Sequence, residues 1–178
     1  RFGVSQRLLL SSKATSPPHL LVMTATPIPR TLTLTHFGEM DVSRLDEMPP
    51  GRTPVETRVI SEEKLPEVVA GLGRHIDHGG QAYWVCPLVE ETEKSDATAA
   101  EERAAVLRMR FGAERVGLVH GRMKGSAKDD VMASFANGEL AVLVATTVIE
   151  VGVDVPNSTL MVVEGAERFG LAQLHQLR

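Results

Sequence analysis

Short apolar runs alternate with amphipathic segments along this chain, and only short connections separate them. The runs with the composition of buried β-strands are HLLVMTAT (His19–Thr26), VETRVI (Val55–Ile60), QAYWVCPLV (Gln81–Val89), VGLVHG (Val116–Gly121), a run that begins at Val142, and TLMVVEGA (Thr159–Ala166). Strands that alternate with helices across short loops form a parallel sheet. We therefore predict an α/β fold with a parallel sheet.

Helical segments are expected between these runs. They are Arg30–Gly38, a helix from Ser61 to Gly79-Gly80, a solvated helix that follows a loop within Glu90–Ala105 and ends near Gly112, Ser126–Asn137, and a last helix from about Gly170. Ser61 is expected to cap its helix, and Val131 and Phe135 are expected to point inward from theirs. The charged run Glu90–Ala105 is expected to be solvated surface and nothing more.

Composition limits the classes of protein that this chain can represent. Its 178 residues are 43% hydrophobic and 24% charged, which is enough apolar material for a real core. The single cysteine, Cys86, excludes an internal disulfide and fits a cytoplasmic protein. A net charge of -4 argues against a uniformly basic nucleic-acid coat, but it leaves a local basic face open. No apolar run approaches the length that spans a membrane.

Two kinds of ligand site are not indicated. His75 and His78 are three residues apart, but no carboxylate or cysteine nearby completes a metal-ligand set, so we expect a polar helix end and no metal site. No G-x-G-x-x-G follows any predicted strand, which excludes a nicotinamide- or flavin-binding Rossmann domain.

The stretch Met48-Pro-Pro-Gly-Arg-Thr-Pro54 is the best signal for a domain boundary. Three prolines and a glycine in so short a span cannot lie inside a helix or a central strand. We therefore predict a linker over residues 49–54, between a first part, residues 1–48, and a second part, residues 55–178.

Polar residues and glycines follow several of the predicted strands directly. They are Thr24-Ala25-Thr26, His120-Gly121, Thr146-Thr147 and Glu164-Gly165. In open parallel sheets ligands bind outside the carboxyl ends of the strands. These residues are therefore expected to gather at one edge of the sheet and to form the functional site.

The corner from Val142 to Pro156 is the richest of these strand ends. Thr147 and Glu150 have the spacing of a capping box, which fits both an ordinary capped helix and a helix start whose free N–H groups bind phosphate. Asp154, in the turn that begins at Gly152, could accept a hydrogen bond from a ribose hydroxyl or from its own backbone. Local chemistry leaves both alternatives open.

Arg122 and Lys124 place two positive charges just after the strand that ends at His120-Gly121. They could contact nucleic-acid phosphates, or they could be plain solvated side chains.

The combination of these segments is more specific than any one of them. TATPIPRTL, VGLVHGRMK, VLVATTVIEVGVDVPN and AERFGLAQLHQLR occur in this order and resemble motifs III, IV, V and the start of VI of the superfamily 2 helicases. Together with DEMPPGRTPV and QAYWVCPLVEE, they are most similar to RecG-type ATP-dependent DNA helicases, and the resemblance covers essentially the whole chain. Transcription-repair coupling factors share the first and last motifs and are less similar around the linker.

The resemblance implies a fold and a division of the chain. The fold would be the RecA-like P-loop NTPase fold, in which ATP and Mg²⁺ lie between two such domains. Residues 1–48 would be the end of the first helicase domain, and residues 55–178 would be most of the second.

The resemblance also implies roles for single residues. Thr24, Ala25 and Thr26 would couple hydrolysis to DNA movement. The DNA-facing residues would be His120, Gly121, Arg122, Thr146 and Thr147. The nucleotide-facing residues would be Gly152, Asp154 and Gln176, the last of which occupies the first position of motif VI.

The chain lacks the parts that phosphoryl transfer requires. It contains no G-x-x-x-x-G-K-[ST] loop and no DExH box, and the resemblance implies that the acidic box falls just before Arg1 and the motif VI arginines just after Arg178. We therefore expect a helicase segment that remodels branched DNA only as part of a longer protein and hydrolyses no ATP alone. The alternatives are a non-catalytic α/β module that binds nucleic acid or a partner, and a segment of a transcription-repair coupling factor.

Overall fold

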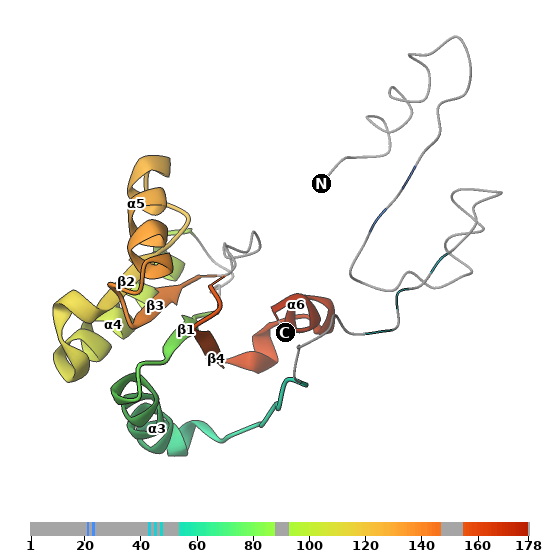
Figure 1. Ribbon diagram of the computed structural model, residues 1–178, viewed down its shortest axis with the longest axis horizontal. Helices are drawn as coiled ribbons and strands as arrows, with labels where there is room; N and C mark the ends of the chain where they lie inside the picture. Colours follow the sequence, from blue (N-terminus) through green and yellow to red (C-terminus); the bar gives the residue numbers. More distant parts are fainter. Residues whose placement is uncertain are drawn as a thin grey trace, which may run out of the picture. The chain divides into compact units, whose positions relative to one another are not determined.

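The computed structural model describes residues 54–87, 93–146 and 155–177, together with Leu21, Met23, Ser43, Leu45 and Glu47. The chain divides into two units, Arg1–Leu45 and Asp46–Arg178, and every helix and strand described below belongs to the second (Figure 1). The strand expected at residues 19–26, the helix expected at residues 30–38 and most of the expected linker lie outside the described residues.

Helices and strands alternate along the second unit. In chain order they are η1 (Glu62–Lys64), α3 (Leu65–Asp77), β1 (Gln81–Val85), α4 (Glu93–Phe111), η2 (Ala113–Arg115), β2 (Val116–Val119), α5 (Gly125–Ala136), β3 (Val142–Ala145), β4 (Ser158–Val163), η4 (Ala166–Arg168) and α6 (Leu171–Leu177), where η is a 3₁₀ helix. The four strands form one sheet in the order β2-β3-β1-β4, and every pair is parallel. The predicted α/β fold with a parallel sheet is confirmed.

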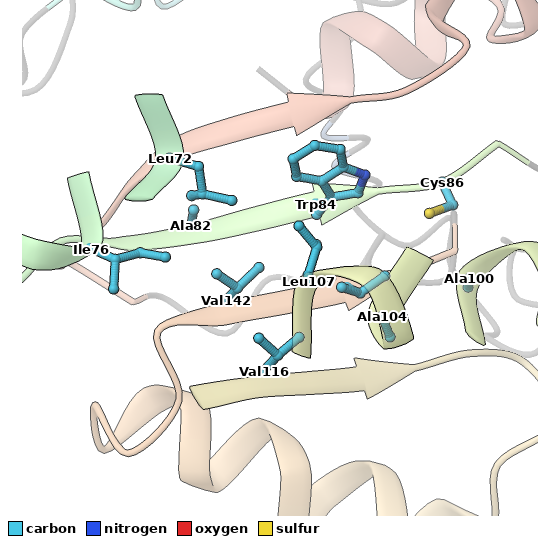
Figure 2. Close-up of a cluster of buried hydrophobic side chains, with 11 residues drawn as sticks. Leu72, Ile76, Ala82, Trp84, Cys86, Ala100, Ala104, Leu107, Val116 and Val142 are labelled. Atoms are coloured by element: carbon cyan, nitrogen blue, oxygen red, sulfur yellow. The ribbon is translucent and has the colours of Figure 1, made fainter. Parts of the chain in front are cut away.

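The first face of the sheet packs against α3 and α4. Alternate residues of the strands point to it, as Ala82, Trp84 and Cys86 do from β1 (Figure 2). The helices add five residues to the same cluster, namely Leu72, Ile76, Ala100, Ala104 and Leu107. Trp84 is fully buried here, and a buried tryptophan contributes more apolar contact area than any aliphatic neighbour.

The second face packs against α5, which Figure 1 shows in orange on the side of the strands opposite α3. Phe135 of α5 is fully buried, and its ring meets the ring of Tyr83 edge-on with centroids 4.9 Å apart. Val131 packs against the same cluster. The predicted inward orientation of Val131 and Phe135 is confirmed, and α5 ends at Asn137 with Gly138 at φ +80°, a conformation that favours glycine.

Two expectations about local structure are wrong. Residues 54–60 are not a strand: they are exposed, Val59 fully so, and none of them joins the described sheet. The apolar alternation is present, but a strand forms only where a neighbouring backbone completes the ladder. Ser61 lies at the start of η1 as expected, yet its side chain makes no capping hydrogen bond.

The charged run Glu90–Ala105 is also more than solvated surface. Within it, α4 turns a row of small residues toward the sheet, and Ala97, Ala100 and Ala104 are buried. Arg103 lies beside this row, with its side chain only 20% exposed, and forms an ion pair. The sequence did not indicate this buried face, because charged residues dominate the segment and alanine is only weakly hydrophobic.

Within the described residues, no helix is long and apolar enough to cross a membrane.

Candidate functional site at the carboxyl edge of the sheet

The carboxyl ends of the four strands are level with one another. Val85 pairs with Ala145 and with Val163, and Ala145 pairs with Val119. The residues that follow these strand ends therefore stand side by side in the order His120, Thr146, Cys86 and Glu164. The prediction that strand-end polar residues share one edge is confirmed for His120, Thr146 and Glu164.

His120 opens a tight turn after β2. Its carbonyl accepts a hydrogen bond from the Met123 amide at 3.2 Å, so the chain reverses and leaves Gly121 and Arg122 exposed. The imidazole is only 12% exposed, and its Nε2 lies 3.6 Å from a carboxylate oxygen of Glu101 on α4. Its buried Nδ1 has no hydrogen-bond partner among the described residues. His120 is thus held inside the edge, while its turn presents the next residues to solvent.

Positive charge gathers where this turn enters α5. Arg122 and Lys124 are exposed, and Lys128, one turn into the helix, lies with its Nζ 3.5 Å from the carbonyl of Gly121. Lys124 is the N-cap residue of α5, and free N–H groups at a helix start attract anions. We call Arg122, Lys124 and Lys128 the basic corner. Sequence analysis missed Lys128, although its spacing of four from Lys124 was a usable signal.

Thr146 continues β3 by one residue. Its amide donates to the carbonyl of Val119 at 3.3 Å, and the residue is 1% exposed. A hydroxyl buried to this degree does not reach a ligand in solvent. Thr147, Gly152 and Asp154, and the triplet Thr24-Ala25-Thr26, lie outside the described residues.

Glu164 carries the other charge at this edge, and two side chains from elsewhere in the chain bind it. The Trp84 indole Nε1 donates to Oε2 at 2.9 Å. The Arg103 guanidinium donates to both carboxylate oxygens, through Nε to Oε2 at 2.8 Å and through a terminal nitrogen to Oε1. The same guanidinium lies 5.5 Å from the centre of the Trp84 ring. Sequence reasoning missed Arg103 and Trp84 because 61 and 80 residues separate them from Glu164.

Cys86 lies between Thr146 and Glu164 at the end of β1. Burial and then the nearby Glu164 carboxylate raise the pKa of the thiol to about 12, and Arg103 offsets part of this. The side chain therefore remains a thiol at neutral pH and is not a nucleophile. An open groove of about 330 Å³ runs past Cys86, Arg103 and Glu164.

Gln176, the remaining predicted nucleotide-facing residue, lies on α6. It is exposed. The amide of Gly170 donates to Oε1 of Gln173 at 3.1 Å, which caps the start of this helix.

Within the described residues, no group of three or more His, Cys, Asp or Glu side chains could hold a metal ion. His75 and His78 instead bond carbonyls, those of Gln81 and Arg74.

Comparison with known proteins assigns this arrangement to a family. Residues 62–178 match the family described as the helicase conserved C-terminal domain. The chain therefore belongs to this family.

Within that family the chain is similar to RecG, as its motifs predicted. It is 56% identical over 182 residues to the ATP-dependent DNA helicase RecG of Pasteurella multocida (strain Pm70), covering 100% of this chain and 26% of that protein. It is 54% identical over 178 residues to RecG of Acidithiobacillus ferridurans, with the same two coverages. The chain thus spans about a quarter of the length of the curated relatives it matches.

A solved structure supports the same assignment. The chain is similar to one described as RecG bound to a three-way DNA junction, with 46% identity and a TM-score of 0.69 over 86% of this chain and 20% of that one. The predicted RecA-like fold of the second part is consistent with this match.

Proposed function

We propose that this chain is part of an ATP-dependent DNA helicase of RecG type that remodels branched DNA in recombination and repair. The observation that carries the proposal is the carboxyl edge of the sheet, where the His120 turn and the basic corner stand beside Thr146 in a chain similar to RecG throughout. We further propose that residues 1–48 end the first motor domain, that residues 49–54 link the domains, and that residues 55–178 form most of the second.

The basic corner is the proposed contact with the DNA backbone. Arg122, Lys124 and Lys128 lie within one turn and one helix start, a density that suits neighbouring phosphates. The His120 imidazole is largely covered and lies beside Glu101, so we assign it the role of holding the turn in place. Thr146 is also buried, so we assign the direct phosphate contact to Thr147 and a supporting role to Thr146.

The nucleotide would be contacted from the same edge. Gly152 and Asp154 are the proposed nucleotide-facing residues of motif V, and exposed Gln176 is that of motif VI. Thr24, Ala25 and Thr26 would couple ATP hydrolysis to DNA movement. ATP and Mg²⁺ supply the phosphoryl group and the charge that neutralises it. We assign Mg²⁺ to none of the described residues, since no carboxylate cluster among them fits it.

Hydrolysis requires more than this segment provides. The 178 residues contain no phosphate-binding G-x-x-x-x-G-K-[ST] loop, so we expect the segment to bind ATP weakly and to hydrolyse none by itself. The single cysteine, reduced and buried, fits a cytoplasmic location.

The test of this proposal is the salt dependence of DNA binding by the full-length protein. The variant Arg122→Ala/Lys124→Ala should bind a three-way DNA junction more weakly, and its slope of log affinity against log salt should be shallower by about 2. The matched control Arg74→Ala/Arg110→Ala removes the same charge from two exposed arginines outside the corner and should keep the wild-type slope.

Two outcomes would count against the proposal. If the corner variant and the control have the same slope of log affinity against log salt, the basic corner does not contact DNA. A full-length protein whose ATP hydrolysis is not stimulated by branched DNA would remove the proposed function itself.

A further inference from the structure

Glu164 is held more firmly than an ordinary surface carboxylate. Arg103 grips both of its oxygens, Trp84 donates a third hydrogen bond, and the side chains of the ion pair are only 20% and 24% exposed. Forked arginine–carboxylate pairs fix direction as well as distance. We call Arg103, Trp84 and Glu164 the β4 clamp.

Stability alone is a weak explanation for this arrangement. Glu56 and Arg58 also form an ion pair, but their side chains are 74% and 75% exposed, and such surface pairs contribute little. The β4 clamp is partly removed from water, and for charged pairs withdrawn from water an apolar pair of the same size is often at least as stabilising. Arg103 sits beside the buried alanines of α4, so an apolar residue would fit there. What the charged pair adds is a defined geometry.

The segment after the clamp transmits that geometry over a short distance. Glu164 is the first residue beyond β4, and its amide donates to the carbonyl of Val85 at 2.9 Å. Gly165 then adopts a left-handed conformation at φ +59°, and the 3₁₀ helix η4 follows at once. Phe169 is buried at the end of η4, and α6 begins at Leu171, directly after Gly170.

Each step of this path is therefore a tight turn or an anchored side chain. Gln176 lies on α6, less than two helical turns from its start. A displacement of Glu164 should therefore also displace α6, because only Gly165, η4 and two further residues connect them.

We propose that the β4 clamp is a positioning device that sets where α6, and with it Gln176, lies when ATP is hydrolysed. This inference rests on the proposed function. In this proposal Arg103, Trp84 and Glu164 bind neither nucleotide nor DNA; they act through the η4–α6 segment.

The test compares variants of the full-length protein in steady-state ATP hydrolysis with a saturating three-way DNA junction. Arg103→Met and Glu164→Gln should each lower kcat roughly tenfold, because a small displacement of a group in a catalytic site lowers the reaction rate strongly. KM for ATP and the affinity for the junction should stay within about twofold, since the clamp touches neither ligand. The double variant should be no worse than either single one, because both remove the same unit.

Two further variants separate positioning from plain loss of structure. Arg103→Lys keeps the charge and most of the stem but not the fork, and its kcat should fall between the wild type and Arg103→Met. Arg110→Met alters an exposed arginine of the same helix and should leave kcat unchanged. The groove beside the clamp is open, so water can replace the lost contacts, and the variants should still fold.

The outcomes distinguish the two proposals. If the DNA junction does not stimulate ATP hydrolysis by the wild-type protein, both the proposed function and the clamp proposal are wrong. If the wild type is active and the clamp variants keep their kcat, the clamp proposal is wrong and the proposed function stands. The same conclusion follows if kcat falls only in proportion to the fraction of folded protein measured by circular dichroism.

Discussion

The two edges of the sheet are built from different chemistry. At the amino edge, the buried Gln81 side chain donates to the carbonyls of Phe135 at 2.6 Å and Leu140 at 2.7 Å, and the backbone carbonyl of Gln81 accepts from the His75 ring. The Ser158 hydroxyl beside it is buried without a hydrogen-bond partner among the described residues, but no charged side chain takes part in these hydrogen bonds. At the carboxyl edge stand a buried imidazole nitrogen without a partner, a clamped carboxylate and an exposed basic corner.

The difference indicates that the two edges of the sheet have different roles. Buried polar groups whose hydrogen bonds are complete stabilise and specify a fold. One unpartnered buried group lies at each edge, so pairing alone does not separate the edges. Charged side chains gathered at one edge are typical of a surface that a ligand or a moving part uses. The amino edge of this sheet is therefore structural, and the carboxyl edge is functional. Substitutions at the two edges should separate stability from activity.

The largest effect on stability is expected at the amino edge. Gln81→Ala leaves the Leu140 carbonyl without its donor and removes one of two donors from the Phe135 carbonyl, which keeps the Gly138 amide. The free energy of unfolding should fall by about 1–3 kcal/mol. ATP hydrolysis per folded molecule should not change. Gln81→Met, which keeps the length of the side chain but not its donors, separates lost hydrogen bonds from lost volume. Denaturant unfolding measures both variants, and a Met variant as stable as the wild type would show that the hydrogen bonds contribute nothing.

The largest effect on function is expected from the pair Thr146-Thr147. Thr147→Val removes the proposed phosphate contact and should weaken junction binding about tenfold, the value of a typical charge-assisted hydrogen bond. Thr146→Val alters a buried hydroxyl and should lower stability by roughly 1 kcal/mol with little change in DNA affinity. Fluorescence anisotropy with a labelled junction measures the affinities. The reverse ranking would exchange the two roles.

Asp154→Ala is the matching test of the nucleotide side. It should lower the DNA-stimulated ATPase rate more than it lowers DNA affinity, because the proposed partner of Asp154 is the nucleotide. An unchanged rate would remove Asp154 from the nucleotide site.

A smaller effect is expected at the turn that leaves β4. Gly165→Ala places a Cβ in a left-handed conformation and 3.1 Å from Cγ of Pro87. The strain should lower stability by about 1–2 kcal/mol. Gly125→Ala is the control, because no atom lies within 4 Å of the added Cβ and alanine suits a helix better than glycine. Thermal unfolding should rank Gly165→Ala below the wild type and Gly125→Ala at or above it.

The smallest effect concerns the pH dependence of stability at Cys86. Folding raises the pKa of this thiol from 9.0 to about 12, so its contribution is fully present below pH 9 and is lost as pH rises toward 12. By pH 10 the loss should be roughly 1 kcal/mol. The melting temperature of the wild type minus that of Cys86→Ala, followed from pH 8 to pH 10, isolates this term. A difference independent of pH would contradict the raised pKa.

Much of the fold was predictable because its signals are local. The alternation of apolar runs with helical segments predicted strands that begin at Gln81, Val116, Val142 and Thr159 and their parallel arrangement, and the structure has a strand at each place. The predicted strand Gln81–Val89 was too long, because β1 ends at Val85. The same alternation failed at Val55–Ile60, because apolar periodicity does not say whether a neighbouring strand is present.

The site was predictable only in part. The rule for the ends of parallel strands predicted that His120, Thr146 and Glu164 share one edge, but it did not show that Thr146 is buried and that the His120 imidazole is only 12% exposed. The β4 clamp escaped prediction because Arg103 lies in a segment that reads as solvated and meets Glu164 only after folding. The roles of Thr24, Ala25, Thr26, Gly152 and Asp154 remain predictions.

Hydrogen–deuterium exchange of the full-length protein, with and without a three-way DNA junction, tests the division between the two edges most directly. We predict that the junction slows amide exchange in the His120–Lys128 turn and helix start. We predict no change at the amino edge, in residues 78–82 and 137–141. Protection of the amino edge with none at the His120 turn would contradict the assignment of function to the carboxyl edge.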